Sequence, residues 1–239
     1  LSPERIVSPP LSEINDLKTS LTEGEKNVLN FFLEHLEIEW EIYIQPYLNG
    51  LRPDFVLLNP TVGIAVFEVK DFDLKSVFYQ NKKSPFRSPI DQSALYKQEI
   101  SDLYLPRIRS RNSYACISSG VIFAHPDSNS LLIEKYCRDI LRYDLKSRYN
   151  QYNPISSCED LDNDNIDKVF PEHKRASSSY MNDEVAKDFR NWLYEPDFAV
   201  EQRKPIKLNS RQETVAYSRP TSGLRRVRGS AGSGKSIVL

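Results

Sequence analysis

Three charged residues lie beside two short apolar runs in a stretch that spans residues 49–71. Asp54 stands directly before the first run, FVLL, and Glu68 and Lys70 follow the second run, IAVF. Both runs are rich in β-branched and aromatic residues, and the segment between them, with its Asn-Pro pair and its glycine, is typical of a turn. The stretch therefore predicts a β-hairpin with the three charged residues near its open end.

Strand geometry indicates which chemistry these residues could perform. In a hairpin symmetric about Thr61, Asp54 lies opposite Glu68, and opposed residues share one face of the sheet. Alternation then puts Lys70 on the face of Glu68, while Val69 points away. Two carboxylates suit a hard cation such as Mg²⁺, and a lysine beside them can hold or polarise a water molecule. The three residues therefore form a candidate site for metal-assisted hydrolysis.

A surface hairpin with charged residues on its solvent face is the alternative interpretation of this stretch. The strand that carries Glu68 argues against it, because large apolar residues occupy both of its faces, as in a central strand. An unpaired charge is costly to bury. Charged residues at the end of such a strand therefore favour a functional role.

Local patterns predict the elements that must position this site. Residues 22–25 resemble a capping box, and apolar residues recur at helical spacing after it, which predicts a helix from Glu23 to about Leu36. Residues 37–47 alternate loosely and suit a first strand that leads into the hairpin. Apolar spacing predicts a second helix over residues 90–108.

The second helix and the strand after it complete the predicted core. Gln92 and Tyr96 are one turn apart on this helix, so both side chains can reach the same target. Pro106 marks a kink or an early end of the helix, and the apolar run 120–124 predicts another strand. A strand, helix, strand order is a crossover unit, so this strand and the strand of Glu68 should be parallel.

The remaining segments have weaker patterns. Residues 1–20 are expected to form an extended N-terminal segment, and the polar stretch around residues 81–85 to form a loop or a short hairpin. Residues 131–146 are moderately helical, and residues 156–167 suit a polar, acidic surface connection. A further helix is predicted over residues 182–193.

Composition predicts a globular protein. Apolar residues make up 39% of the 239 residues and the formal net charge is -1, so contact with DNA would need a local basic patch. The basic run after Gln202 could supply one, or could belong to another domain. The three cysteines and three histidines lack metal-ligand spacing, so ordinary thiols and core or surface histidines are expected. Without a signal-peptide pattern or a membrane-length apolar run, a cytoplasmic protein with no membrane contact is expected.

Four short motifs, taken in order, carry a family resemblance. Gly24-Glu25, Arg52-Pro53-Asp54, Glu68-Val69-Lys70 and Gln92-x-x-x-Tyr96 together resemble the NERD (nuclease-related) domain, a branch of the PD-(D/E)xK nuclease superfamily. The resemblance covers roughly residues 21–126. It implies an α/β, restriction-endonuclease-like core with a mixed central sheet flanked by helices, followed here by a helical C-terminal extension. Arg52 stands where NERD sequences often have an acid.

The resemblance also implies a role for each residue of these motifs. Asp54, Glu68 and the Val69 carbonyl would hold Mg²⁺ or Mn²⁺, Lys70 would orient the attacking water, Glu25 would support the metal site, and Gln92 with Tyr96 would brace the site or the scissile strand. The implied activity is phosphodiester hydrolysis in DNA. Two alternatives stay open, because Glu25 could be only a helix-capping acid and Gln92 with Tyr96 could be ordinary helix-surface residues.

A second strong motif lies near the end of the sequence. Residues 229–236 match the phosphate-binding pattern GxxxxGK[ST] at every position, with glycines at Gly229, Gly232 and Gly234. In such a loop the backbone amides can cradle phosphates, while Lys235 neutralises charge and Ser236 reaches Mg²⁺. A flexible Gly/Ser segment is the alternative interpretation.

Upstream of this loop, Gln212 resembles the adenine-contacting glutamine of superfamily one DNA helicases. Residues 202–239 thus resemble the truncated start of a helicase ATP-binding domain. They would follow a nuclease-like domain over residues 21–150 and an acidic, helical connection over residues 151–201. The later motifs that ATP hydrolysis requires do not occur in these 239 residues. ATP binding is therefore expected only in a full-length parent that carries the helicase motor in cis.

These resemblances together predict a metal-dependent DNA nuclease at the front of a nuclease-helicase that acts in DNA processing, repair or defence against foreign DNA. The alternative is a catalytically weak DNA-docking module of an ATP-dependent DNA helicase. The choice between DNA and RNA, between endo- and exonuclease action, and the oligomeric state stay open at this point.

Overall fold

The computed structural model describes residues 4–17, 19–48, 50–80, 88–108, 110–143, 145, 152–194, 208 and 210–218. The chain forms two compact units, Leu1–Glu195 and Pro196–Leu239. The predicted loop around residues 81–85, the phosphate-binding motif at 229–236 and most of the basic run after Gln202, apart from Arg211, lie outside the described residues. Within the described ranges, no helix has the length and apolar character needed to cross a membrane.

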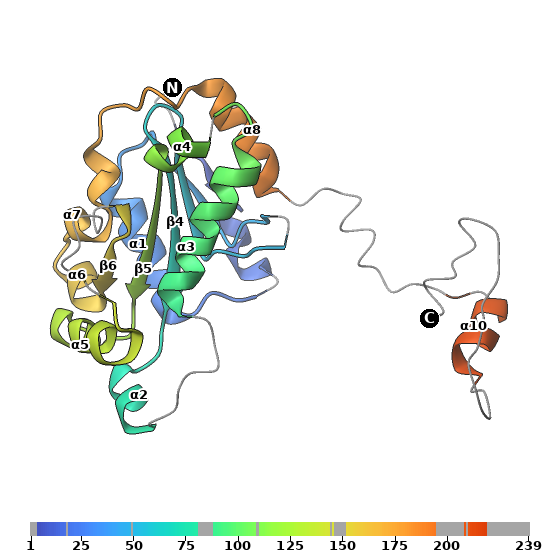
Figure 1. Cartoon of the computed structure of the whole chain (residues 1–239), viewed down its shortest axis with the longest axis horizontal. Coiled ribbons are helices and arrows are strands. Elements are labelled where there is room, and N and C mark those ends of the chain that lie inside the picture. Colours follow the sequence, from blue (N-terminus) through green and yellow to red (C-terminus); the bar gives the residue numbers. More distant parts are fainter. Residues whose placement is uncertain are drawn as a thin grey trace. The chain divides into compact units, whose positions relative to one another are not determined.

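The first unit is built on a six-stranded mixed sheet (Figure 1). Its strands lie in chain order: β1 (Val7–Ser8), β2 (Glu41–Ile44), β3 (Phe55–Asn59), β4 (Gly63–Lys70), β5 (Ile117–Phe123) and β6 (Ile155–Ser157). The β2, β3 and β4 strands pair antiparallel, whereas β1 pairs parallel with β2, and β4, β5 and β6 pair parallel. The predicted mixed α/β class is confirmed, and the sheet is consistent with a nuclease-like core.

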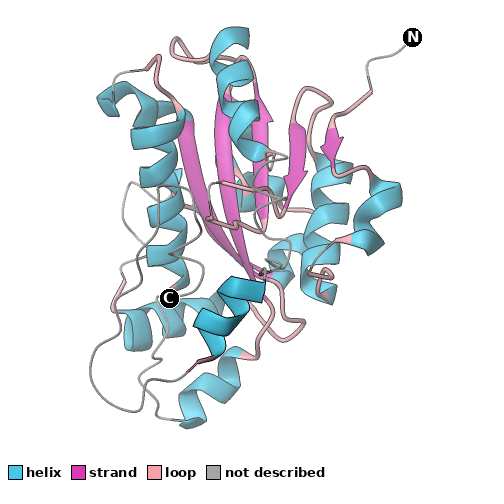
Figure 2. Cartoon of the chain, turned by 90° about the vertical axis from the view of Figure 1, so that its right-hand side faces the viewer, coloured by secondary structure: helices cyan, strands magenta, loops and turns pink. Residues whose placement is uncertain are grey.

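Helices lie on both sides of this sheet (Figure 2). The α-helices are α1 (Glu23–His35), α2 (Leu74–Gln80), α3 (Pro89–Glu99), α4 (Ser110–Ser113), α5 (Ser130–Tyr136), α6 (Cys158–Asp162), α7 (Ile166–Val169) and α8 (Asp183–Leu193), with α10 (Ser210–Tyr217) in the second unit. Short 3-10 turns occur at η1 (Leu11–Asp16), η3 (Tyr114–Cys116) and η6 (Pro171–Lys174), and π-helical turns extend α3 at η2 (Ile100–Tyr104) and α5 at η4 (Cys137–Leu141).

The hairpin of β3 and β4 has the predicted register. Asn59 pairs with Gly63 and Phe55 with Phe67, so the next pair outward joins Asp54 and Glu68. The turn is closed locally, because the Asn59 side chain accepts hydrogen bonds from the backbone N–H and the hydroxyl of Thr61, at 3.0 and 2.9 Å. The predicted parallel crossover is also confirmed, since β4 and β5 pair parallel.

Strand alternation divides the apolar side chains between two faces of the sheet. On one face, Phe55 and Phe67 pack against Phe32 of α1, with ring centroids 5.8 and 5.2 Å away. On the other face, Val56 and Val66 pack in a cluster with residues of α3 and α8. Even-numbered residues of the hairpin therefore point toward α3. The charged residues at positions 54, 68 and 70 follow the same alternation.

Two segments differ from the sequence-based expectation. The polar stretch after β4 begins with helix α2, because Asp73 accepts the N–H of Lys75 and Leu74 is buried in a third apolar cluster. Residues 156–167 do not form a surface connection. They contain the end of β6 and helix α6, whose start is fixed by a capping box between Ser157 and Asp160.

Candidate active site

Asp54, Glu68 and Lys70 come together at the open end of the hairpin. Glu68 lies on β4 between two neighbouring strands and is only 4% exposed. Asp54 accepts a hydrogen bond from the N–H of Val69 at 2.6 Å, which fixes its carboxylate across the strand end. Lys70 donates to Oε1 of Glu68 at 2.5 Å. The structure thus places two carboxylates and an ammonium group side by side, as strand alternation predicted.

One oxygen of this group lacks a partner. Oε2 of Glu68 is buried and meets no donor at hydrogen-bond distance and angle within the described part of the chain, although the Tyr96 hydroxyl lies close enough to lower the pKa of Glu68. A buried polar atom left unsatisfied costs about 1–3 kcal/mol, and more when the group is charged. Such an atom beside a second carboxylate has the chemistry of a site for a hard cation, since oxygen donors suit Mg²⁺ and Mn²⁺. The residues present therefore fit a divalent metal ion.

The raised pKa values of Asp54 and Glu68 also favour a cation site. Burial, and next the negative charge of Glu68, raise the pKa of Asp54 to about 8, although the N–H of Val69 and the charge of Lys70 act against this shift. Burial also raises the pKa of Glu68, with Lys70 and Tyr96 acting in the opposite direction. Without a cation, the two carboxyl groups therefore retain protons to higher pH than exposed carboxylates do. A bound cation would replace those protons.

Glu25 is both a helix cap and a neighbour of this pair. It occupies the third position of α1, where Oε2 accepts the N–H of Thr22 at 2.7 Å and its own N–H donates to Oγ1 of Thr22 at 3.2 Å. The side chain is buried, at 8% exposure, and its charge raises the pKa of both Asp54 and Glu68. The helix-capping interpretation of Glu25 is confirmed, while its support of a metal site stays a prediction.

Gln92 and Tyr96 lie on α3, on the face that covers the hairpin. The Gln92 amide donates to the Tyr96 hydroxyl at 2.8 Å, and that hydroxyl donates to the carbonyl of Arg52 at 3.3 Å. Burial, and to a lesser extent the charges of Glu68 and Asp54, raise the pKa of Tyr96. The tyrosine is therefore a protonated hydrogen-bond donor beside the carboxylates at neutral pH. The structure brings this pair to the site, while its role there stays a prediction.

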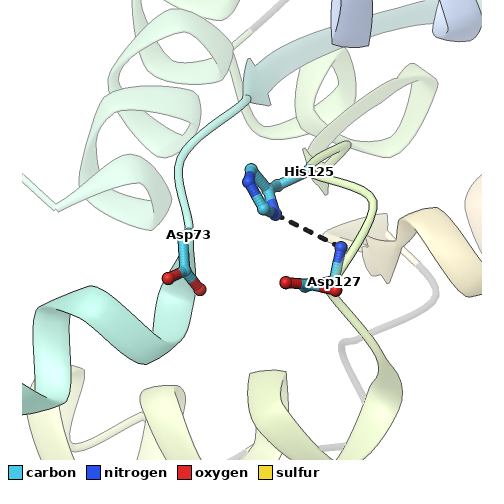
Figure 3. Close-up of side chains that lie close together, drawn as sticks. All are labelled: Asp73, His125 and Asp127. Atoms are coloured by element: carbon cyan, nitrogen blue, oxygen red, sulfur yellow. Dashed lines mark hydrogen bonds between the residues drawn. The ribbon is translucent and has the colours of Figure 1, made fainter.

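A second group of possible metal ligands follows the ends of β4 and β5. Asp73, His125 and Asp127 each offer one ligand atom, and these atoms lie within 4.8 Å of one another (Figure 3). Three interactions already involve the group. Nδ1 of His125 accepts the N–H of Asp127 at 3.2 Å, Oδ1 of Asp73 accepts the N–H of Lys75 at 2.8 Å, and the ammonium of Lys75 lies 3.6 Å from Asp127. This group could hold a metal ion, but its imidazole and both of its carboxylates already have interaction partners.

Sequence reasoning missed this second group, because its three residues lie on two separate loops. The only available signal was topological. Asp73 lies shortly after the strand of Glu68, and His125 directly follows the next predicted strand. The ends of neighbouring parallel strands meet at the same edge of a sheet.

The predicted nucleotide-site residues all belong to the second unit, Pro196–Leu239. Gly229, Gly232, Gly234, Lys235 and Ser236 lie outside the described residues, and Gln212 lies on α10 in the second unit. For Val69, the described contact is through its N–H, so its carbonyl as a metal ligand stays a prediction.

Comparison with known proteins finds a family similarity in the first part of the chain. Residues 20–124 match the family model of NERD, the nuclease-related domain. No curated protein and no solved structure matches the chain. The matched range contains the whole hairpin site together with α1 and the two α3 residues, which indicates a nuclease-related, hydrolase-like function for this part of the chain. The comparisons give no evidence for a fused helicase.

Proposed function

We propose that the domain at residues 20–124 is a divalent-metal-dependent nuclease that hydrolyses phosphodiester bonds in DNA. One observation carries the proposal. Oε2 of Glu68 is buried and unpaired within the described residues, and the carboxylate of Asp54 lies beside it. A nuclease-related domain supplies the reaction class, and the unpaired oxygen supplies a reason for a cation.

In this proposal, Asp54, Glu68 and the carbonyl of Val69 hold Mg²⁺ or Mn²⁺. When bound, such an ion supplies Lewis-acid polarisation of a phosphoryl oxygen and a lower pKa for water. Both carboxylates are fixed before any ion arrives, Asp54 by the N–H of Val69 and Glu68 by Lys70. Because the two side chains are already fixed, they lose little conformational freedom when an ion binds.

The side chains around the carboxylates have separate tasks. Lys70 uses one N–H to hold Glu68, and an ammonium group has two further donors that can orient a water molecule for in-line attack. The Tyr96 hydroxyl, held by Gln92, stays protonated, and its one proton can turn from the Arg52 carbonyl to a phosphate oxygen of the scissile strand. The negative charge of Glu25 increases the attraction of the site for a cation.

The test is a digestion panel with the full chain. Linear and circular, single- and double-stranded DNA, with matched RNA, are incubated with Mg²⁺, Mn²⁺ or EDTA, and Lys70→Ala and Glu68→Gln are run beside the wild type. Removal of a positioned catalytic group typically costs about 10²–10⁴-fold in rate. Lys75→Ala is the matched control, because Lys75 is an exposed lysine that follows the same strand and pairs with Asp127. Equal cleavage by Lys70→Ala and the wild type, or cleavage that persists in EDTA, contradicts the proposal.

The wider role proposed for this nuclease is the front part of a nuclease-helicase in DNA processing, repair or defence against foreign DNA. Only the sequence of residues 202–239 supports this extension, through Gln212 and the phosphate-binding motif at 229–236. A longer chain that continues past Leu239 should show DNA-stimulated ATP hydrolysis that Lys235→Ala abolishes. Unchanged ATP hydrolysis in that variant contradicts the helicase assignment and leaves the nuclease proposal intact.

A further inference from the structure

Asp71 connects the strand that carries the candidate site to the start of helix α1. It directly follows Lys70, and its carboxylate Oδ2 accepts the backbone N–H of Gly24 at 3.0 Å. Strand alternation sends Glu68 and Lys70 toward α3 and sends position 71 toward α1. Asp71 therefore lies on the side of the sheet opposite to the Asp54 and Glu68 carboxylates, where it contacts the first turn of α1.

Gly24 fits at this junction because it has no side chain. A Cβ atom there would lie 2.8 Å from Cβ of Ala124 and 2.9 Å from Cγ of Asp71. The first turn of α1 is thus in direct contact with the segments that follow β4 and β5. The Gly24 N–H belongs to the first turn of α1, where helix N–H groups lack partners within the helix and an acceptor carboxylate is favourable.

The residue after Gly24 is Glu25, so this contact helps to determine where the Glu25 carboxylate lies. The capping box with Thr22 orients the side chain within its own helix, but it cannot place the helix against the sheet. Phe32 packs the middle of the helix on the sheet, and the Asp71 hydrogen bond with the tight packing of Gly24 holds the first turn, which carries Glu25. In this position, the charge of Glu25 acts on both Asp54 and Glu68.

We propose that Asp71 is a positioning residue that holds Glu25 beside the Asp54–Glu68 pair through its hydrogen bond to the Gly24 N–H. The inference rests on the proposed function, because it assigns Asp71 a role in the same site. Its chemical requirement is an acceptor oxygen rather than a negative charge. Asparagine at position 71 keeps such an oxygen, whereas alanine removes it.

The first test is a set of cleavage rates. Asp71→Ala should lower kcat by about 10- to 100-fold, since a displacement of about 1 Å remote from the reacting atoms can cost that much, and Asp71→Asn should recover most of the rate. Asp71→Ala combined with Glu25→Gln should be no slower than Glu25→Gln alone, because both changes remove the same interaction. The control is Glu23→Gln at the same helix end, where the exposed carboxylate pairs with Lys26 at 2.6 Å.

Two outcomes of these rates overturn the inference. Losses of Asp71→Ala and Glu25→Gln that multiply show that Asp71 does not act through Glu25. Equal losses in Asp71→Asn and Asp71→Ala show that the charge, rather than the hydrogen bond, is what matters. A wild type that does not cleave DNA contradicts the proposed function instead, and the inference is then decided by a measurement that needs no activity.

That measurement is hydrogen exchange across the first turn of α1, together with Mn²⁺ titration. Asp71→Ala should speed exchange of the Gly24 and Glu25 amides and weaken Mn²⁺ binding, while Asp71→Asn should stay close to the wild type in both. A urea melt of each variant checks that the domain is folded. Unchanged exchange and unchanged Mn²⁺ affinity in folded Asp71→Ala overturn the inference.

Discussion

The buried carboxyl pair should make the metal-free protein less stable as the pH rises, and Glu68→Gln should remove most of that dependence. The pKa of Asp54 is about 8 in the folded protein, against about 4 in an unfolded chain. Between these two values the folded state binds about one more proton than the unfolded state. The stabilisation from this proton is complete below about pH 4 and is lost as the pH rises through about 8.

The size of the effect follows from proton linkage. A difference of one bound proton changes the free energy of unfolding by about 1.4 kcal/mol per pH unit, so the wild type should lose up to about 3 kcal/mol between pH 5 and pH 7. Glu68→Gln removes the negative charge that is the second cause of the raised pKa of Asp54. The pKa of Asp54 should then fall, and the slope of stability against pH should become shallower.

Urea denaturation in EDTA at pH 5, 6 and 7 measures these slopes. This range lies below the pKa of the buried Lys97, which burial lowers to about 8, so that lysine does not titrate in it. Glu41→Gln is the matched control, because Glu41 is also a buried glutamate of the same sheet but pairs with Arg190 at 2.5 Å. Glu41→Gln should be less stable than the wild type at every pH, but its free energy of unfolding should change with pH as steeply as that of the wild type. If the free energy of unfolding of Glu68→Gln also changes with pH as steeply as that of the wild type, the reasoning is refuted.

Three further predictions concern other parts of the domain. Tyr96→Phe removes the hydroxyl that Gln92 holds at 2.8 Å, and kinetics should show a several-fold lower kcat, with a urea midpoint near that of the wild type. Burial raises the pKa of Asp160, but hydrogen bonds from Lys168 and from Ser157, the N-cap residue of α6, outweigh burial and lower this pKa overall. Asp160→Asn should therefore cost about 1–3 kcal/mol at pH 7 and less as the pH falls below about 4, and an equal cost at pH 3 would contradict this. Gly120→Ala puts a Cβ 2.5 Å from a phenylalanine ring, so urea melts should show a loss of about 1–3 kcal/mol.

Much of the hairpin site could be predicted because its geometry is local. The turn between β3 and β4 fixes the register, and the register places Asp54 opposite Glu68 without any long-range information. Helix α1 was equally predictable, since Thr22 and Glu25 form a capping box before regularly spaced apolar residues. The parallel pairing of β4 and β5 followed from handedness and connection rules.

Other features depend on tertiary contacts that no local pattern reports. Strand β6 contains the buried Ser156 and Ser157, and such polar residues resemble a surface connection until their pairing with β5 is known. The short α2 helix is stabilised by burial of Leu74 rather than by a long periodic pattern. The approach of His125 to Asp73 requires two loops at one edge of the sheet, and sequence spacing does not encode that distance.

Calorimetric titration of Mn²⁺ into the metal-free chain tests most directly whether the Asp54–Glu68 pair is a metal site. At pH 6.5 the wild type should bind an ion with release of protons, because the pKa of Asp54 lies above that pH. Glu68→Gln should lose this binding, while His125→Ala, which disrupts the second group of possible ligands, should retain it. Unchanged binding in Glu68→Gln, or binding lost in His125→Ala alone, would contradict the account.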